Sequence, residues 1–214
     1  MALAKKRDDD VRGEILAAAV RTIEEGGLAD LSMREVARRA GVSHQLPYHY
    51  FTDREGILAA IAQSGFTLLG ARLRKLTTAD MTGAEKLAAA GREYVEFACD
   101  HPAHFRVMFR NDFVAVERFP TAQENADDCF ALLPKLVGEA IADGLPPKPD
   151  ERALVILGWS IAHGLACLLL DGPLAKKLPD AAGARAATVH AVMEALKNLV
   201  EASSKPRRKR PRST

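Results

Sequence analysis

The sequence predicts an all-α protein in which a small helical unit precedes a larger helical bundle. Apolar residues recur at spacings of three and four along most of the 214 residues, and no stretch shows the alternation typical of a strand. Near the N-terminus, a capped helix, a glycine turn and a second short helix form a helix-turn-helix pattern. With 48% apolar residues, the chain can bury a substantial core.

The N-terminal unit is expected to contain three short helices and the start of a longer one. We expect the acids at residues 8–10 at the N-terminus of the first helix, and Gly26 and Gly27 at its end. Its apolar stripe comprises Val11, Ile15, Ala18, Ala19, Thr22 and Ile23. Ser32 and Glu35 match a capping box that starts the second helix, and Gly41 ends it. The next helices are expected at about residues 44–50 and 53–76.

The rest of the chain predicts a helical bundle followed by a basic tail. Helices are expected at about residues 84–99, 102–109, 120–143, 150–170 and 184–202. The expected division is an arm at residues 1–9, the helix-turn-helix unit at 10–70, the bundle at 71–203 and a disordered basic tail at 204–214. The last two long helices carry more apolar surface than one bundle can hide, which predicts a C2 homodimer through them.

The distribution of charge and the spacing of the cysteines indicate which partners and which cellular compartment the sequence favours. The tail carries six of the 30 basic residues, so the rest of the chain has 24 basic against 28 acidic residues, and any attraction to nucleic acid must come from a local patch. Three distant cysteines without C-x-x-C spacing indicate reduced, buried thiols in a cytoplasmic protein. We see no apolar leader, and the longest apolar run, LACLLL, is far shorter than the roughly 20 residues of a membrane span.

The stretch GVSHQLPYHYF, residues 41–51, combines aromatic rings, histidines and a proline. On a helix, Pro47 and Phe51 share one face, and we expect them to pack inward with Val36 and Val42. The opposite face and its sides would then present Gln45, His49, Leu46 and Tyr48. An amide, an imidazole, an apolar tip and a phenol are suited to contact base edges in DNA.

The proline is expected to be tolerated because it lies in or just after the first helical turn, with Ser43 as the N-cap. Backbone N–H groups in that turn lack intrahelical partners in any case, so Pro47 forfeits little.

The segment LSMREVARRAGVSHQLPYHYFTDREGILAAI resembles the DNA-binding segment of TetR-family transcriptional regulators, over about residues 10–70. The resemblance implies a homodimer, usually a repressor, that a small apolar or amphipathic effector releases from double-stranded operator DNA. It implies phosphate and backbone contacts by Ser32, Arg34, Ser43, Tyr48, Tyr50 and Arg54. It implies base contacts by His44, Gln45, Leu46 and His49. The chain departs from the common family pattern at residues 44–46, which leaves its operator sequence open.

The second half of the chain resembles the regulatory domain of this family more loosely. HPAHFRVMF and WSIAHGLACLLLDG are similar to one branch that carries a tryptophan and a His-Gly pair in a late helix. Trp159, His163 and Cys167 form one helical stripe, and the small residues Gly158, Ala162 and Ala166 form the next. Trp159 and His163 either line an effector cavity or belong to a plain core, and the small stripe admits a close helix, including one of a second subunit. Further pocket candidates are Tyr94, Phe97, Phe105, Met108, Phe109 and Phe130.

Other chemistries receive little support from the residue spacing. His44 and His49 are five residues apart, and His101 and His104 have no acidic or cysteine partners nearby, so we expect no metal. No set of nucleophile, base and orienting residue stands out, so we expect no catalytic residues, no cofactor and no enzyme activity. The alternative functions are a helical-bundle enzyme or binding protein that uses Trp159 and His163, and an interaction protein without a DNA target.

Overall fold

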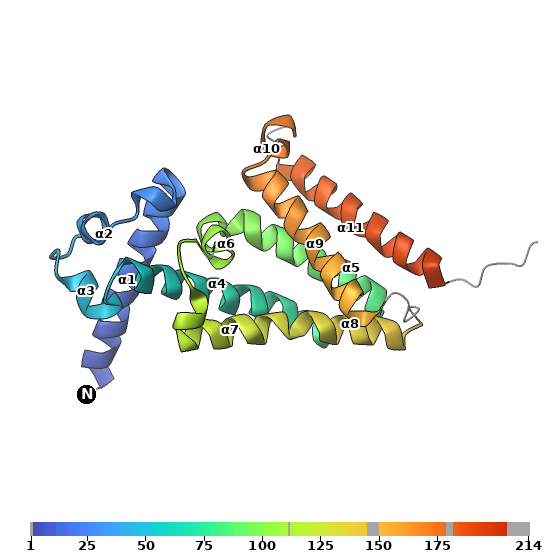
Figure 1. Ribbon diagram of the computed structural model, residues 1–214, viewed down its shortest axis with the longest axis horizontal. Coiled ribbons are helices and arrows are strands. Elements are labelled where there is room, and N and C mark those ends of the chain that lie inside the picture. The colour runs from blue at the N-terminus through green and yellow to red at the C-terminus, as the bar shows by residue number, and fades with distance from the viewer. Residues whose placement is uncertain (1, 111, 145–149, 179–181, 205–214) are drawn as a thin grey trace, which may run out of the picture. The chain divides into compact units, whose positions relative to one another are not determined.

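The computed structural model describes residues 2–110, 112–144, 150–178 and 182–204 (Figure 1). Every regular element within these ranges is an α-helix or a short 3-10 helix, which confirms the all-α prediction. Residues 205–214 of the expected basic tail lie outside the described residues.

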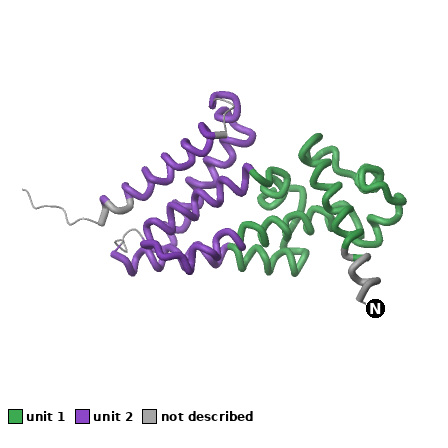
Figure 2. The backbone as a smooth tube through the Cα atoms, turned by 180° about the vertical axis from the view of Figure 1, so that it is seen from behind, with its two compact units in different colours: residues 1–70, 100–129 green, residues 71–99, 130–214 purple. Residues whose placement is uncertain are grey.

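The chain divides into two compact units (Figure 2). Unit 1 comprises residues 1–70 and 100–129, and unit 2 comprises residues 71–99 and 130–214. Unit 1 therefore contains residues 100–129 in addition to the helix-turn-helix segment, although the sequence analysis grouped them with the bundle. The assignment of functional domains to these parts of the chain stays a prediction.

Unit 1 is built on the N-terminal helices and on three elements between residues 100 and 130. Its elements are α1 (Ala2–Gly26), η1 (Leu28–Asp30), α2 (Met33–Ala40), α3 (Leu46–Phe51), the first part of α4 (Arg54–Thr77), α6 (Pro102–Met108), η2 (Val116–Arg118) and most of α7 (Pro120–Phe130). The stripe expected on α1 is buried, with Ile15, Ala18, Ala19 and Ile23 fully covered. Thr22 is buried on the same face because its hydroxyl donates to the Ala18 carbonyl at 2.8 Å.

The first helix begins earlier than expected. Helix α1 starts at Ala2, so Asp8 and Asp10 lie within the helix instead of at its N-terminus. The preceding residues, ALAKKR, are strong helix formers with no glycine or proline among them, and nothing there stops the helix from extending backward. Residues 2–9, which were expected to form an arm before the helix-turn-helix unit, are thus part of α1.

The segment at residues 120–143 also differs from expectation, because it forms two helices and not one. Helix α7 ends at Phe130, and α8 (Leu132–Ala142) begins after a turn at Ala131. Pro134 explains the break, since it has no N–H to donate to the Phe130 carbonyl and is tolerated only in the first turn of a new helix. A further short helix, α10 (Leu174–Lys177), lies in a stretch that was expected to be a connection only.

Unit 2 packs α5 (Gly83–Asp100) with α8, α9 (Glu151–Leu170) and α11 (Ala182–Ser204). Two glycines on α5 allow close approach: a Cβ at Gly83 would lie 2.2 Å from the Ala140 Cα, and one at Gly91 would lie 2.3 Å from the Met193 sulfur. The described core of this unit includes Ala88, Val95, Phe97, Leu136, Val137, Leu165, Ala166, Val189 and Met193. The expected boundaries of α5, α9 and α11 agree with the structure within two residues.

A tight joint connects α3 to α4. Thr52 has φ 61° and ψ −57°, and the Asp53 N–H donates to the Phe51 carbonyl across it, which is the geometry of a strained γ-turn. The Asp53 carboxylate then caps α4 by accepting from the Gly56 N–H at 2.8 Å. Gly56 is required there, because a Cβ at this position would lie 2.0 Å from the Phe51 carbonyl oxygen.

We predict that Gly56→Ala lowers the free energy of unfolding by about 1–3 kcal/mol, because the added methyl group meets backbone that cannot move aside cheaply. Gly13→Ala is the matched control, since nothing lies within 4 Å of a Cβ there. In the middle of α1, that change should stabilise the chain by up to about 1 kcal/mol. Urea unfolding of both variants measures the difference, and equal stabilities would contradict the close approach at the α3–α4 joint.

Candidate nucleic-acid interface

The helix-turn-helix segment is formed by α2, a glycine turn and α3. The Ser32 hydroxyl accepts from the Glu35 N–H at 3.2 Å and caps α2, as the S-x-x-E spacing predicted. Gly41 ends α2 with φ 68° and ψ 28°, in the left-handed region that favours glycine. The chain is thereby turned so that α3 starts five residues later.

Helix α3 presents one buried and one exposed face. Pro47 and Phe51 are buried, as the helical spacing predicted, and Val36 beneath them is fully buried. Tyr48 is 49% exposed although it is a large aromatic residue. The other exposed predicted base or phosphate contacts of this segment are Ser43, His44, Gln45 and His49, and Leu46 is half-buried.

The start of α3 differs by two residues from the expected one. The N-cap is Gln45 and not Ser43, and the Gln45 side chain makes no capping hydrogen bond. Pro47 is then the second residue of the helix, where its missing N–H costs no intrahelical bond. The Gln45 amide instead contacts the His44 imidazole, with 3.1 Å between Nε2 of each side chain.

Two residues that were expected to touch DNA have partners within unit 1. Arg54 donates from Nε to the Leu31 carbonyl at 2.9 Å and from Nη2 to the Leu28 carbonyl at 2.7 Å. The Tyr50 hydroxyl donates to Asp8 at 2.6 Å, and this bond raises the pKa of Tyr50. In this structure Arg54 therefore links α4 to the α1–α2 connection through hydrogen bonds within the protein.

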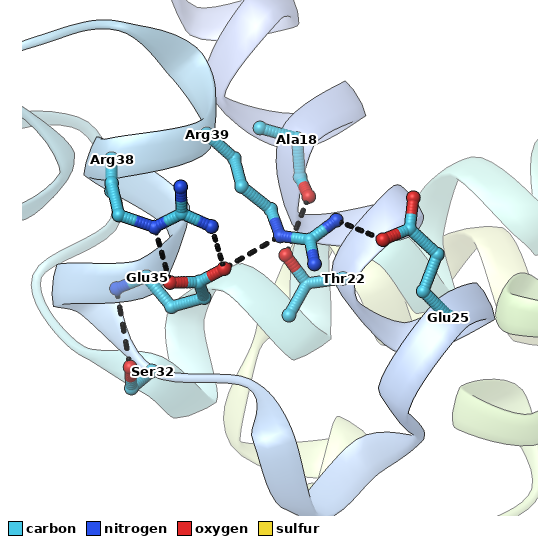
Figure 3. A network of polar contacts seen from close by, with 7 residues as sticks. All are labelled: Ala18, Thr22, Glu25, Ser32, Glu35, Arg38 and Arg39. Atoms are coloured by element: carbon cyan, nitrogen blue, oxygen red, sulfur yellow. Dashed lines mark hydrogen bonds and ion pairs between the residues drawn. The ribbon is translucent and has the colours of Figure 1, made fainter.

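A network of charged side chains on α1 and α2 was not anticipated from the sequence (Figure 3). The Glu35 carboxylate accepts two hydrogen bonds from Arg38, at 2.6 and 2.8 Å, and one from Arg39 at 2.7 Å. Arg39 also donates to Glu25 on α1 at 2.5 Å. The spacing of Glu35 with Arg38 and Arg39 by three and four residues is a signal for such pairs, whereas the link to Glu25 depends on the fold.

The hydrogen bonds from Arg38 and Arg39 lower the pKa of Glu35 from 4.5 to about 2. The carboxylate is therefore ionised at all ordinary pH values and holds both guanidinium groups on α2. Arg38 stays largely exposed beside the exposed Arg34 and Ser32. Helix α2 thus carries three arginines, Arg34, Arg38 and Arg39, against the single acidic residue Glu35, so its own charge is positive although the rest of the chain has no strong net positive charge.

A second group of predicted residues comes together in unit 2. The Tyr94 hydroxyl accepts from the Trp159 indole N–H at 3.2 Å and lies 2.8 Å from Nδ1 of His163. The Phe130 ring meets the Trp159 ring edge to face, with 5.3 Å between centroids. Burial lowers the pKa of His163, which favours a neutral imidazole that accepts from Tyr94. Trp159 and His163 are half-buried, and Phe130 is exposed.

The remaining pocket candidates are divided between the units. Phe97 is fully buried in unit 2, with the Arg72 guanidinium 5.8 Å from its ring centroid. Phe105 and Met108 are buried in unit 1, and the half-buried Phe109 ring lies 5.3 Å from that of Phe105. The eight candidates therefore do not line one site within a single unit.

Two expectations for α9 need correction. The small residues Ala162 and Ala166 are buried within unit 2, so this stripe faces the interior of the unit and cannot receive a helix of a second subunit. The cysteines are not uniformly buried, since Cys129 is buried, Cys99 is half-buried and Cys167 on α9 is exposed. Among the described residues, no group of three or more histidine, cysteine, aspartate or glutamate side chains could hold a metal ion.

The fold and this site define a helix-turn-helix protein with a second helical unit. A family model for bacterial regulatory proteins of the tetR family matches residues 15–61, and a model for the tetracyclin repressor-like C-terminal domain matches residues 87–196. Since the second model alone covers half of the chain, the chain belongs to the TetR family. This family consists of transcriptional regulators and not of enzymes.

Individual relatives agree with this assignment. The regulator BetI of Rhizobium meliloti is 41% identical over 106 residues, which cover 50% of this chain and 45% of BetI. The transcriptional activator FasR of Mycolicibacterium smegmatis is 28% identical over 106 residues, which cover 50% of this chain and 48% of FasR. The matches thus span about half the length of these curated relatives.

Solved structures match over nearly the whole chain. A protein of unknown function from Rhodococcus sp. RHA1 is 30% identical with a TM-score of 0.73, and the match covers 91% of this chain and 96% of that one. The fatty acid degradation regulator FadR from Bacillus halodurans is 20% identical with a TM-score of 0.70, covering 87% and 94% of the two chains. At that identity, FadR supports the fold alone.

The charged network gives a pH-dependent prediction. Because the pKa of Glu35 is lowered in the folded chain, its stabilising contribution is present above about pH 4.5 and is lost as the pH falls toward about 2. Glu35→Gln should therefore be less stable than the wild type at pH 7, and the gap should shrink steadily below pH 4.5. Denaturant midpoints at several pH values measure the gap, with Glu24→Gln, an exposed glutamate on α1, as the control. A gap of constant size from pH 7 to pH 3 would contradict the network.

Proposed function

We propose that this chain is a homodimeric transcriptional regulator that reads an operator through α3, and that it is a repressor released by a small apolar or amphipathic ligand. Such a regulator acts in the cytoplasm, where its DNA target is. The observation that carries the proposal is the exposed face of α3, where hydrogen-bonding and aromatic side chains surround a helix whose opposite face is buried. A single helix with this face fits the major groove of B-form DNA.

Base reading is assigned to four residues at and near the start of α3. His44, Gln45 and His49 are exposed, and Leu46 is half-exposed beside them. A glutamine amide can pair with adenine, a histidine can donate to a guanine acceptor, and a leucine can pack on a thymine methyl group. The N-terminal part of a recognition helix is the part that meets base edges, which agrees with the position of these residues.

Phosphate binding is assigned to residues that border this face. Ser32 and Arg34 are exposed at the start of α2, and Ser43 and Tyr48 are exposed around α3. Hydroxyl groups and guanidinium groups at these places position the protein on the backbone without reading sequence. Tyr50 could contact phosphate only if its hydrogen bond to Asp8 breaks. Arg54 could do so only if it loses its hydrogen bonds to the Leu31 and Leu28 carbonyls.

We predict that substitutions of base-reading residues and of phosphate-binding residues change DNA binding in different ways. Gln45→Ala should cost about 1–3 kcal/mol at one or two operator positions and relax the preference there. Arg34→Ala should weaken binding to every sequence by a similar factor and reduce the salt slope by about one. Binding of both variants to a randomised DNA library at two salt concentrations tests the difference. An unchanged sequence preference in Gln45→Ala would mean that α3 is not the reader.

The effector is proposed to bind near the Tyr94, Trp159 and His163 cluster in unit 2. Their three polar groups bond to one another among apolar and aromatic neighbours, and Trp159 and His163 keep partial exposure. Few oriented polar groups among apolar walls are typical of small-molecule sites. Phe130 on the edge of Trp159 supplies an apolar surface that a ligand can cover.

The dimer is proposed to form through α9 and α11. Helix α9 is long and apolar enough to span a membrane by length and composition. Three of its large apolar residues are nevertheless exposed: Ile156 by 51%, Leu157 by 46% and Leu168 by 41%. After the first two residues of the helix, its exposed positions lie on one stripe, formed by Ala153, Ile156, Leu157, Ser160, Cys167 and Leu168. A stripe of this kind needs cover, and an equivalent helix of a second copy supplies it in a family of homodimers.

Helix α11 adds a surface of small residues. Ala187, Ala191 and Ala195 are exposed four residues apart, and Leu199 continues the row with 69% of its surface exposed. Alanines at this spacing let a neighbouring helix approach closely. The two helices from each of two copies would then form a four-helix interface.

We predict that the wild-type chain has a dimeric mass at micromolar concentration and that Ile156→Glu has a monomeric mass. The charged side chain would be buried without a partner at the interface, which strongly opposes association. Leu68→Glu is the matched control, because Leu68 is an exposed leucine of the other long apolar helix, α4. Analytical ultracentrifugation of the three proteins decides the question. A monomeric wild type, or an Ile156→Glu variant that remains dimeric, would contradict this interface.

A further inference from the structure

Unit 1 contains an open cavity of about 250 Å³ beside the C-terminal end of α3. Its walls come from four helices: Arg12 of α1, residues 50–52 at the end of α3, the first turns of α4 and the first turn of α7. The volume is slightly below the roughly 300–1,000 Å³ of drug-sized ligand sites, so an occupant must be small. The cavity shares no residue with the Tyr94, Trp159 and His163 cluster.

The charge in this cavity comes from Arg12. Its guanidinium carbon lies 4.9 Å from the centroid of the buried Phe51 ring, so the cation is held at the cavity by a ring of the recognition helix. Arg12 has no hydrogen bond or ion pair to any residue that the structure describes, and no other described lining residue is charged. The nearby Asp8, one turn earlier on α1, accepts from the Tyr50 hydroxyl. An anion in the cavity would therefore meet the Arg12 guanidinium, which has no ion-pair partner among the described residues.

The start of α7 adds hydrogen-bond donors to the lining of the cavity. Pro120 has no N–H, and the first-turn N–H groups of Thr121 and Ala122 have no intrahelical acceptor. The hydroxyls of Thr52 and Thr121 and the Gln63 amide belong to the same lining. Donors and a guanidinium that converge on one small space suit an oxyanion.

The remaining walls are apolar and narrow. The Phe51 ring, Ala59, Ala60 and Ala122 are buried residues of this lining, and Phe119 is half-buried. These surfaces would contact an apolar body but offer it no hydrogen bonds. The lining thus combines one cationic end with an apolar remainder.

We propose that this cavity binds a small monoanionic carboxylate with a compact apolar body. The carboxylate pairs with the Arg12 guanidinium and accepts from the first-turn N–H groups of α7, while the body packs on Phe51 and the alanines of α4. Since residues 50–52 form one wall, the occupant touches the end of α3 and the strained Thr52 joint. The site is in this way placed to tune the helix that reads DNA.

The test is direct binding of benzoate to the full chain without DNA, with benzamide as the neutral probe of the same shape. Titration calorimetry should show saturable binding of benzoate and at least tenfold weaker binding of benzamide. Arg12→Gln should weaken benzoate binding at least tenfold, because it removes the cation and keeps a polar side chain at an exposed position. Ala60→Leu should abolish binding by filling the cavity, and Arg21→Gln, an exposed arginine elsewhere on α1, should bind like the wild type.

Three outcomes would overturn the proposal: no saturable benzoate binding, equal binding of benzamide, or unchanged benzoate affinity in Arg12→Gln. Ala60→Leu is checked by its thermal unfolding, and Arg12→Gln keeps the test decisive if that variant does not fold. Because no DNA is present, failure of this site is distinguishable from failure of the proposed operator binding.

Discussion

The burial of Phe51 and Pro47 is the constraint on which the rest of the candidate interface depends. Helix α3 has only six residues, far fewer than an isolated helix needs to be stable in water. Its place is therefore set by docking: Phe51 is 4% exposed, Arg12 covers its ring, and Gly56 lets α4 approach its carbonyl. Because this face is buried, the side chains of Gln45 and His49 on the opposite face are exposed to solvent.

Charged side chains then keep the supporting helices rigid around α3. Arg39 ties α2 to α1 through Glu35 and Glu25, and Arg54 satisfies two carbonyls of the α1–α2 connection. Each of these guanidinium groups lies beside the proposed DNA surface but bonds within the protein. The contact of Arg54 with phosphate, which the family resemblance implies, stays a prediction, because both of its printed hydrogen bonds are to carbonyl groups of the protein.

Features that depend on neighbours in sequence could be predicted, and features that depend on distant partners could not. The Ser32 cap, the left-handed Gly41 and the inward face of Pro47 follow from local rules. The break before α8 was not predicted, because the apolar spacing continues across it, although Pro134 is a local signal for it. By contrast, the Tyr50 bond to Asp8 joins residues 42 positions apart, and the grouping of residues 100–129 with unit 1 reflects packing that periodicity does not report.

Helix α3 is proposed to enter the major groove, and site-specific cross-linking to DNA reports whether it does. A photo-cross-linking amino acid at His49, which is exposed on α3, should label bases of bound DNA in the wild-type background. The same group at Glu124, exposed on α7, should label none. We expect labelling of bases from position 49 alone, and labelling from position 124 without any from position 49 would show that α3 does not enter the groove.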